Sequence, residues 1–148
     1  MDTSEQRTER DRRVYFALLN GNYTEAKSLV HSEAPSFVQF IDEYIAQHGL
    51  VRQTVLLKAD IPVGVGYKYL NGTKRTKNRN TILRLCIAMQ MGIEDTQKAL
   101  SLYGMNALTE TGRDNIITIG IDHRSNVDTI DEWLRGLSME PLMEEYDR

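Results

Sequence analysis

Residues 52–72 read RQTVLLKADIPVGVGYKYLNG, and this stretch decides what the rest of the chain can build. Residues 51–59 carry apolar side chains at helical spacing and predict a first short helix. Pro62 suits the first turn of a second helix, expected over 63–70, because its missing N–H would be unpaired there anyway. The Asn-Gly dipeptide at 71–72 then ends that helix. The stretch therefore predicts two short helices joined by a tight turn.

The sequence around this pair has helical periodicity as well. The clearest segment is 36–48, in which five apolar residues fall on one helical face before Gly49 supplies the stop. Further helices are expected over 7–19, 23–30, 81–89, 94–103, 115–123 and 128–137. We therefore predict an all-α protein of about eight helices, the first two forming an N-terminal helical hairpin.

An internal repeat is visible towards the C-terminus. Residues 79–108 match residues 113–142 with a constant offset of 34 and no gap. The identical pairs are Arg79/Arg113, Ile82/Ile116, Ile87/Ile121, Leu100/Leu134, Met105/Met139 and Leu108/Leu142. A period near 34 is typical of a two-helix unit. We expect one helix pair followed by its copy; the alternative is two unrelated amphipathic hairpins with coincident spacing.

Charge is segregated along the chain. Residues 50–90 contain eight Lys or Arg and one acid, whereas residues 1–49 have a net charge of −3 and residues 91–148 a net charge of −7. A basic segment inside an acidic chain is costly by self-repulsion, and such a stripe is the usual footprint of phosphate recognition. The basic segment also contains the two short helices.

Length and composition exclude several classes of protein. A chain of 148 residues with 41% hydrophobic and 26% charged residues suits one ordinary globular domain. It has no apolar run long enough to cross a membrane, and its charged start does not resemble a signal peptide. The single cysteine, Cys86, is expected to be buried and suits a reducing, cytoplasmic compartment. Trp133 is expected either in the core, which is the default, or in a dimer contact. We find no catalytic set, metal-ligand spacing or cofactor motif, so we do not expect an enzyme, a cofactor or a metal site.

The segment from Arg52 to Gly72 has a Gln near the start of the first helix and Lys68 near the end of the second. It resembles the phage-repressor-like helix-turn-helix family, which is the xenobiotic-response-element type of bacterial or phage-like regulator. Residues 82–89 resemble the core helix that follows. The resemblance covers about residues 36–108 and implies a five-helix repressor-like domain. We divide the chain into an N-terminal helical hairpin (1–34), a helix-turn-helix domain (35–110) and a C-terminal helix pair (111–148) packed on the same core.

Some positions depart from the family pattern. Asp60 stands in the turn where glycine is common, and Pro62 provides no capping oxygen. Gly64 and Gly66 lie inside the second helix, each costing about 0.8–1 kcal/mol relative to Ala. These glycines would either let the backbone approach DNA closely or leave the helix frayed.

The resemblance implies a transcription regulator that binds double-stranded DNA sequence-specifically. Its recognition helix, 62–70, would enter the major groove, and the basic loop 73–79 would follow the phosphates. The candidate DNA-binding residues are Gln53, Val63, Gly64, Tyr67, Lys68, Asn71, Thr73, Lys74, Arg75, Lys77 and Arg79. A homodimer is expected by analogy with palindrome readers, and the acidic flanks offer a surface for a protein partner. The alternative is a protein-interaction adaptor on a helix-turn-helix scaffold that no longer reads DNA.

Overall fold

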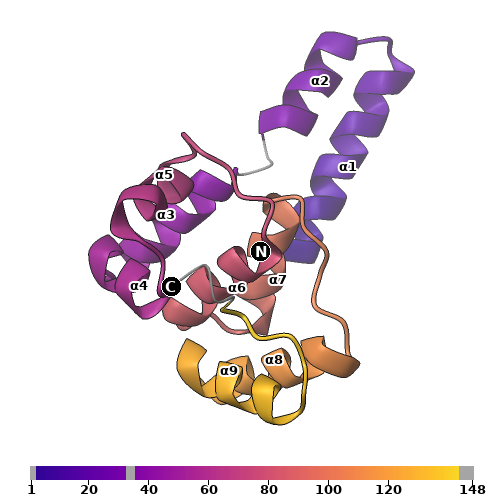
Figure 1. Ribbon diagram of the computed structural model, residues 1–148. Helices are drawn as coiled ribbons and strands as arrows, with labels where there is room; N and C mark the ends of the chain where they lie inside the picture. Colours follow the sequence, from indigo (N-terminus) through magenta and orange to yellow (C-terminus); the bar gives the residue numbers. More distant parts are fainter. Residues whose placement is uncertain (1–2, 33–35, 144–148) are drawn as a thin grey trace. The chain divides into compact units, whose positions relative to one another are not determined.

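The structure, a computed structural model, describes residues 3–32 and 36–143, and these residues form nine α-helices and no strand (Figure 1). The helices are α1 (Thr3–Leu19), α2 (Tyr23–Ser32), α3 (Phe37–Gln47), α4 (Arg52–Lys58), α5 (Val63–Asn71), α6 (Arg79–Ala88), α7 (Ile93–Leu102), α8 (Gly112–Asp122) and α9 (Val127–Gly136). The all-α prediction is confirmed, and each of the nine segments expected to be helical corresponds to one helix, although the total was expected to be about eight. None of the helices in the described ranges combines the length and apolar character needed to cross a bilayer.

The chain divides into two compact units, Met1–Ser36 and Phe37–Arg148. The ends of the ranges predicted for the hairpin (1–34) and for the C-terminal pair (111–148) lie outside the described residues. In the first unit, α1 and α2 form an antiparallel hairpin that buries Ala17, Ala26 and Leu29. The Asn22 side chain caps α2, because its Oδ1 accepts from the N–H of Glu25 at 3.2 Å.

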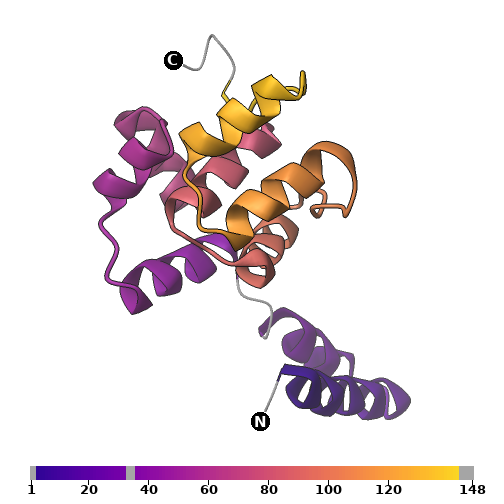
Figure 2. The ribbon, with the colours of Figure 1, turned by 90° about the horizontal axis from the view of Figure 1, so that it is seen from below.

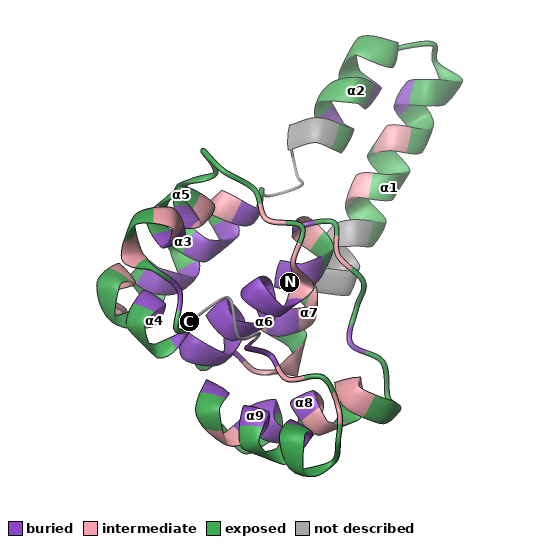
Figure 3. Cartoon of the chain, viewed as in Figure 1, coloured by how far each residue is buried: buried purple, intermediate pink, exposed green. Residues whose placement is uncertain are grey.

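The second unit has a single core that runs from Phe37 to Met143. Helix α6 lies at its centre, and every residue from Asn80 to Ala88 is buried (Figure 3). Helices α3 and α4 contact the α6–α7 pair, and α8 and α9 also pack against it (Figures 1 and 2). The α6–α7 pair is therefore the common support for the α4–α5 pair and for the C-terminal pair.

The same tight turn joins the helices of three successive pairs. Asp60, Gln90 and Arg124 each adopt a left-handed backbone, with φ between 56° and 60°. Each follows the C-cap residue of α4, α6 or α8, and its N–H donates to a carbonyl of the last helical turn. Asp60 therefore takes the conformation for which glycine is usual, which explains how the turn forms without it.

The offset of 34 found in the sequence recurs in the geometry of the second unit. Adding 34 to the bounds of α7 gives those of α9, and adding it to α6 gives those of α8 to within one residue. At the start of α6, Arg79 donates from Nε to the carbonyl of Asn106 and from Nη2 to that of Ala107, both at 3.0 Å. It also forms a bidentate ion pair with Asp114, with both N···O distances 2.9 Å.

The counterpart of Arg79 in the second copy makes equivalent bonds. Arg113 donates to the carbonyls of Glu140 and Pro141, which lie 34 residues beyond the carbonyls that Arg79 binds. Its Nη2 also donates to Oδ1 of Asn80 at 2.8 Å, and Asn80 is the counterpart of Asp114. Each arginine thus closes its own helix pair and reaches the first turn of the other pair.

A buried arginine joins the α4–α5 turn to the segment that follows α9. Arg84 is only 3% exposed; it donates to the carbonyl of Ala59 at 3.1 Å and to that of Leu142 at 2.8 Å. The carboxylate of Asp131, on α9, accepts from the N–H groups of Leu142 and Met143. Arg84 therefore belongs to the core and adds no charge to the surface.

Candidate nucleic-acid interface

Helix α5 presents one polar and one apolar face. Gly64, Tyr67, Lys68 and Asn71 are exposed, with Tyr67 at 39%, and they recur at helical spacing. The opposite face packs on the core through Gly66 and Leu70, which are buried, and through half-buried Val63, Val65 and Tyr69. Among the candidate residues of this helix, Val63 is thus the one that contributes to core packing.

Gly64 and Gly66 have different surroundings. A Cβ atom added to Gly66 would lie 2.4 Å from Cδ2 of the buried Leu56, whereas one added to Gly64 would meet nothing within 4 Å. The α5 helix runs continuously from Val63 to Asn71, so of the two alternatives for these glycines the structure does not show a frayed helix. Residue 66 must be glycine because α4 and α5 approach each other closely there. Gly64 has no such neighbour, and it is the glycine of this helix at which the backbone is accessible from solvent.

The end of α5 is fixed by local hydrogen bonds. Gly72 is left-handed, with φ 81°, and a Cβ at this position would lie 2.9 Å from Cγ2 of Val38 on α3. Oδ1 of Asn71 accepts from the N–H of Thr73 at 2.9 Å and from its hydroxyl at 2.7 Å. Asn71 and Thr73 therefore shape the exit from the helix.

The α5–α6 loop, residues 73–78, is anchored to a tyrosine that the sequence analysis did not single out. The N–H of Thr76 donates to the hydroxyl of Tyr103 at 2.8 Å. The guanidinium of Arg75 lies 4.1 Å from the ring centroid of Tyr103, and its Nη2 donates to the carbonyl of that residue at 2.8 Å. The buried Tyr103 ring packs edge-on against Phe37, with 4.7 Å between centroids. The helix expected over 94–103 includes Tyr103, but its sequence carries no signal for this anchoring role.

The remaining basic side chains of the loop extend into solvent. Lys74 and Lys77 are exposed, as is Lys68 on the last turn of α5. No Asp or Glu occurs between Asp60 and Glu94 in the sequence. The α5 surface and the α5–α6 loop thus present three exposed lysines without an acid from their own segment.

Two other bases of the 50–90 segment form ion pairs with acids of the same chain. Arg52 forms an ion pair with Asp42 on α3 at 2.7 Å, beside Gln53, which is exposed near the start of α4. Arg79 begins α6 and is held by Asp114 and two carbonyls. Burial alone would raise the pKa of the Asp114 carboxyl, but hydrogen bonds from Arg79 and Thr109 outweigh burial and lower that pKa below its usual value. The charge of Arg79 is therefore neutralised locally.

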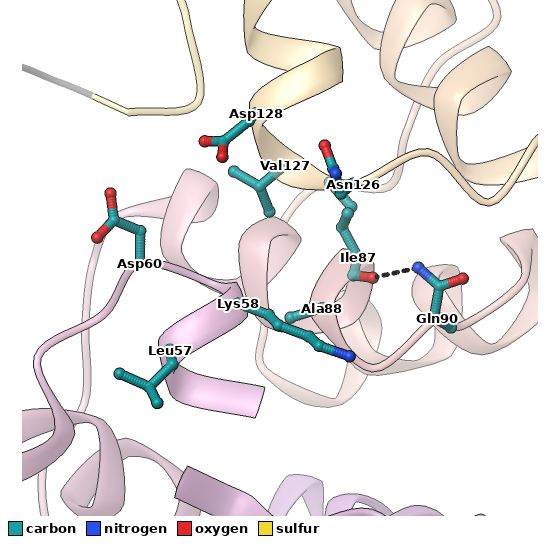
Figure 4. A pocket seen from close by; sticks show the side chains of 9 residues that line it. All are labelled: Leu57, Lys58, Asp60, Ile87, Ala88, Gln90, Asn126, Val127 and Asp128. Carbon is teal, nitrogen blue, oxygen red and sulfur yellow. Dashed lines mark hydrogen bonds between the residues drawn. The ribbon is translucent and has the colours of Figure 1, made fainter. Parts of the chain in front are cut away.

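Two hollows adjoin the α4–α5 pair. A shallow one of about 350 Å³ lies between α3, α4 and α5 and includes Tyr67 and Asn71 in its lining. A larger groove of about 520 Å³ is lined by Leu57, Lys58, Asp60, Ile87, Ala88, Gln90, Asn126, Val127 and Asp128 (Figure 4). In the described parts of the chain, no cluster of three or more His, Cys, Asp or Glu side chains is arranged to hold a metal ion.

Comparisons with known proteins do not help to interpret this geometry. The chain matches no family model, and the searches of curated proteins and of solved structures find no similar chain.

Proposed function

We propose that the α4–α5 pair is a helix-turn-helix that binds double-stranded DNA and regulates transcription. Helix α5 enters the major groove with Gly64, Tyr67 and Lys68 towards the bases, and the α5–α6 loop follows a phosphate backbone. The observation that carries this proposal is the group of exposed lysines on an anchored loop, in a segment free of acids.

The anchored loop supports phosphate binding for an energetic reason. Ordering a loop residue on binding costs about 1–2 kcal/mol in backbone entropy, which subtracts from affinity. The two hydrogen bonds and the cation–π contact at Tyr103 order the loop before any ligand arrives. Lys74 and Lys77 are therefore presented on a preformed backbone, and Arg75 fixes the loop. Because Arg79 is held by Asp114, we leave it out of the proposed phosphate contacts.

The test is a fluorescence anisotropy titration with labelled duplexes from genomic DNA, repeated across salt concentrations. Each phosphate contact contributes about 0.9 to the slope of log K against log salt, so Lys74→Ala with Lys77→Ala should reduce the slope by about 1.8. Lys27→Ala, in α2, removes an exposed lysine that is not among the proposed contacts and serves as the matched control. Absence of binding at low salt would refute DNA binding, and an unchanged slope in the double variant would refute the assignment of phosphate contacts to Lys74 and Lys77. The stoichiometry on a palindromic site tests whether two copies bind.

Loop anchoring is tested separately. Tyr103→Phe removes the hydroxyl that accepts from Thr76 but retains the ring beneath Arg75. We expect weaker binding with an unchanged salt slope, because the lysines remain and only their preorganisation is lost. A protein-interaction role remains the second candidate, and it would be favoured if no duplex binds while the chain forms a stoichiometric complex with another protein.

A further inference from the structure

The C-terminal pair leaves large apolar side chains exposed. Ile119 is 41% exposed on α8, Trp133 is 38% exposed on α9, and Leu137, one turn later, is 52% exposed. A Cβ on Gly120 would lie 3.6 Å from Cζ3 of Trp133, so the indole ring approaches α8 at the residue that follows Ile119. Trp133 and Leu137 lie four residues apart and therefore on the same side of their helix. Of the two expectations for Trp133, a place in the core is therefore wrong, and a dimer contact stays a prediction. We call Ile119, Trp133 and Leu137 the C-terminal apolar face.

The first copy of the repeat shows what covers the equivalent surface. Subtracting 34 from these positions gives Leu85, Ala99 and Tyr103, which are 0%, 0% and 4% exposed. In the first copy, α3 packs on α7 and α4 packs on α6. The T-shaped contact between Tyr103 and Phe37 is part of that α3 packing. Within the second unit, the main helix contacts of α9 are with α8 and α6, and neither α3 nor α4 is among them.

We propose that the C-terminal apolar face binds an amphipathic helix of a partner protein, which lies across α9 as α3 lies across α7. Such a helix would present aromatic and aliphatic side chains at i, i+3, i+4 and i+7, as α3 does with Phe37, Phe40, Ile41, Tyr44 and Ile45. The binding mode is a helix on an apolar surface, and the repeat supplies its geometry.

Charged residues at the edge of the C-terminal apolar face indicate the charge that the partner helix should carry. In the first copy, Nζ of Lys98 lies 5.2 Å from the ring centroid of Phe40, at the edge of the α3 contact. The equivalent position in the second copy is Glu132, which is exposed, and the counterpart of Ala88 is the exposed Asp122. The partner helix should therefore be basic where α3 is acidic. Glu43 is the acid nearest in sequence to Phe40 on the same surface of α3, so it marks the position where a basic residue is expected.

A second copy of the chain fits this face less well. A fully exposed side chain of this size presents roughly 150–250 Å², so burying three half-exposed ones in a symmetric pair removes only on the order of 600 Å². A stable symmetric interface buries about 1,200 Å² or more. A two-fold pair would also bring Glu132 towards its own copy. A single helix requires less area and can supply the opposite charge.

The experiment uses the full-length protein and two helical peptides of the α3 sequence, residues 36–48, stapled between the exposed positions 42 and 46. One peptide keeps Glu43 and the other carries Glu43→Lys. Trp133 is the only tryptophan of the chain, so its emission and its quenching by acrylamide report occupancy directly. We expect the lysine peptide to shift the emission to shorter wavelength, to reduce quenching and to bind about fivefold tighter than the glutamate peptide.

Two variants make the test specific. Leu137→Asp, at an exposed position, should abolish the response while leaving the helical content unchanged. Glu132→Lys should reverse the preference between the two peptides. The proposal is overturned if neither peptide changes Trp133 emission, or if both bind equally to the wild type. It is also overturned if Trp133 of the protein alone is already protected from acrylamide, either in a species of twice the mass (a second copy covers the face) or in a monomer (the chain covers it itself).

Discussion

The two glycines of α5 provide a quantitative test of how the α4–α5 pair is packed. Both lie in the same short helix, but only Gly66 faces another side chain. A Cβ at Gly66 would lie 2.4 Å from Cδ2, 2.8 Å from Cδ1 and 3.0 Å from Cγ of Leu56, which is 0% exposed. Carbon atoms at optimal separation are about 3.5–4.0 Å apart, so the added methyl overlaps a side chain that has no free volume to enter.

The expected free energies follow from this difference. Replacing glycine by alanine in a helix interior stabilises by about 0.8–1 kcal/mol, and Gly64→Ala should approach that gain. Gly66→Ala has the same propensity gain but adds overpacking strain of about 1–3 kcal/mol. The two variants should therefore differ in their free energy of unfolding by about 1–3 kcal/mol, with Gly66→Ala the less stable.

Urea denaturation followed by circular dichroism measures both values. A double-mutant cycle identifies the cause: Leu56→Ala removes the overlapping atoms, so Gly66→Ala should become stabilising in that background. The reasoning would be refuted if Gly66→Ala stabilised the wild-type protein as much as Gly64→Ala does. It would also be refuted if the effect of Gly66→Ala kept its sign in the Leu56→Ala background.

Three further predictions follow from the fold. Burial raises the pKa of the Cys86 thiol to about 12, so Ellman's reagent at pH 8 should react with it only after unfolding. The free energy of unfolding should also fall above about pH 9, because there the unfolded chain alone releases this proton. The lowered pKa of Asp114 stabilises the folded state above its ordinary pKa, so this contribution should disappear as pH falls below about 4, and Asp114→Asn should flatten that part of the stability profile. Asp60→Gly should raise the free energy of unfolding by about 1 kcal/mol, measured by urea denaturation, because residue 60 is left-handed.

Helices were predictable because their signals are local. The segment 36–48 was predicted from periodicity and a stop glycine, and α3 runs from Phe37 to Gln47. The start of α6 was predicted two residues late, at Thr81, because the cap is formed by a side chain. Oδ1 of Asn78 accepts from the N–H of Asn80, which allows the helix to begin inside a run of polar residues.

The candidate interface was harder to predict because net charge is counted along the chain, whereas accessibility is set in three dimensions. Arg84 was counted among eight bases but lies in the core, bonded to carbonyls. Arg79 was placed in the loop but closes the repeat through Asp114. The repeat itself indicates a structural role for Arg79, because Arg113 occupies the matching position outside the basic segment. No sequence signal indicated that Tyr103 would hold the loop, since that contact joins residues 27 apart.

The three helix pairs also show how close packing is kept while sequence changes. The residues four before and six after the left-handed residue are Leu56 and Gly66 in the first pair, and Gly120 and Ile130 in the third. In the third pair, a Cβ on Gly120 would lie 2.4 Å from Cγ1 of Ile130, so the same crossing is kept with the large and small residues exchanged.

The middle pair has side chains of intermediate size at these positions, Cys86 and Thr96, both buried. Volume is thus conserved across the crossing, as close packing of interiors requires. The C-terminal pair lies outside the basic segment and also packs a glycine against a large side chain at this crossing. Gly66 therefore reflects helix packing and gives no argument for or against DNA recognition. The case for DNA binding therefore depends on the lysines of α5 and of the α5–α6 loop, and Gly64 is the glycine of α5 whose substitution would test close approach of the backbone to a duplex.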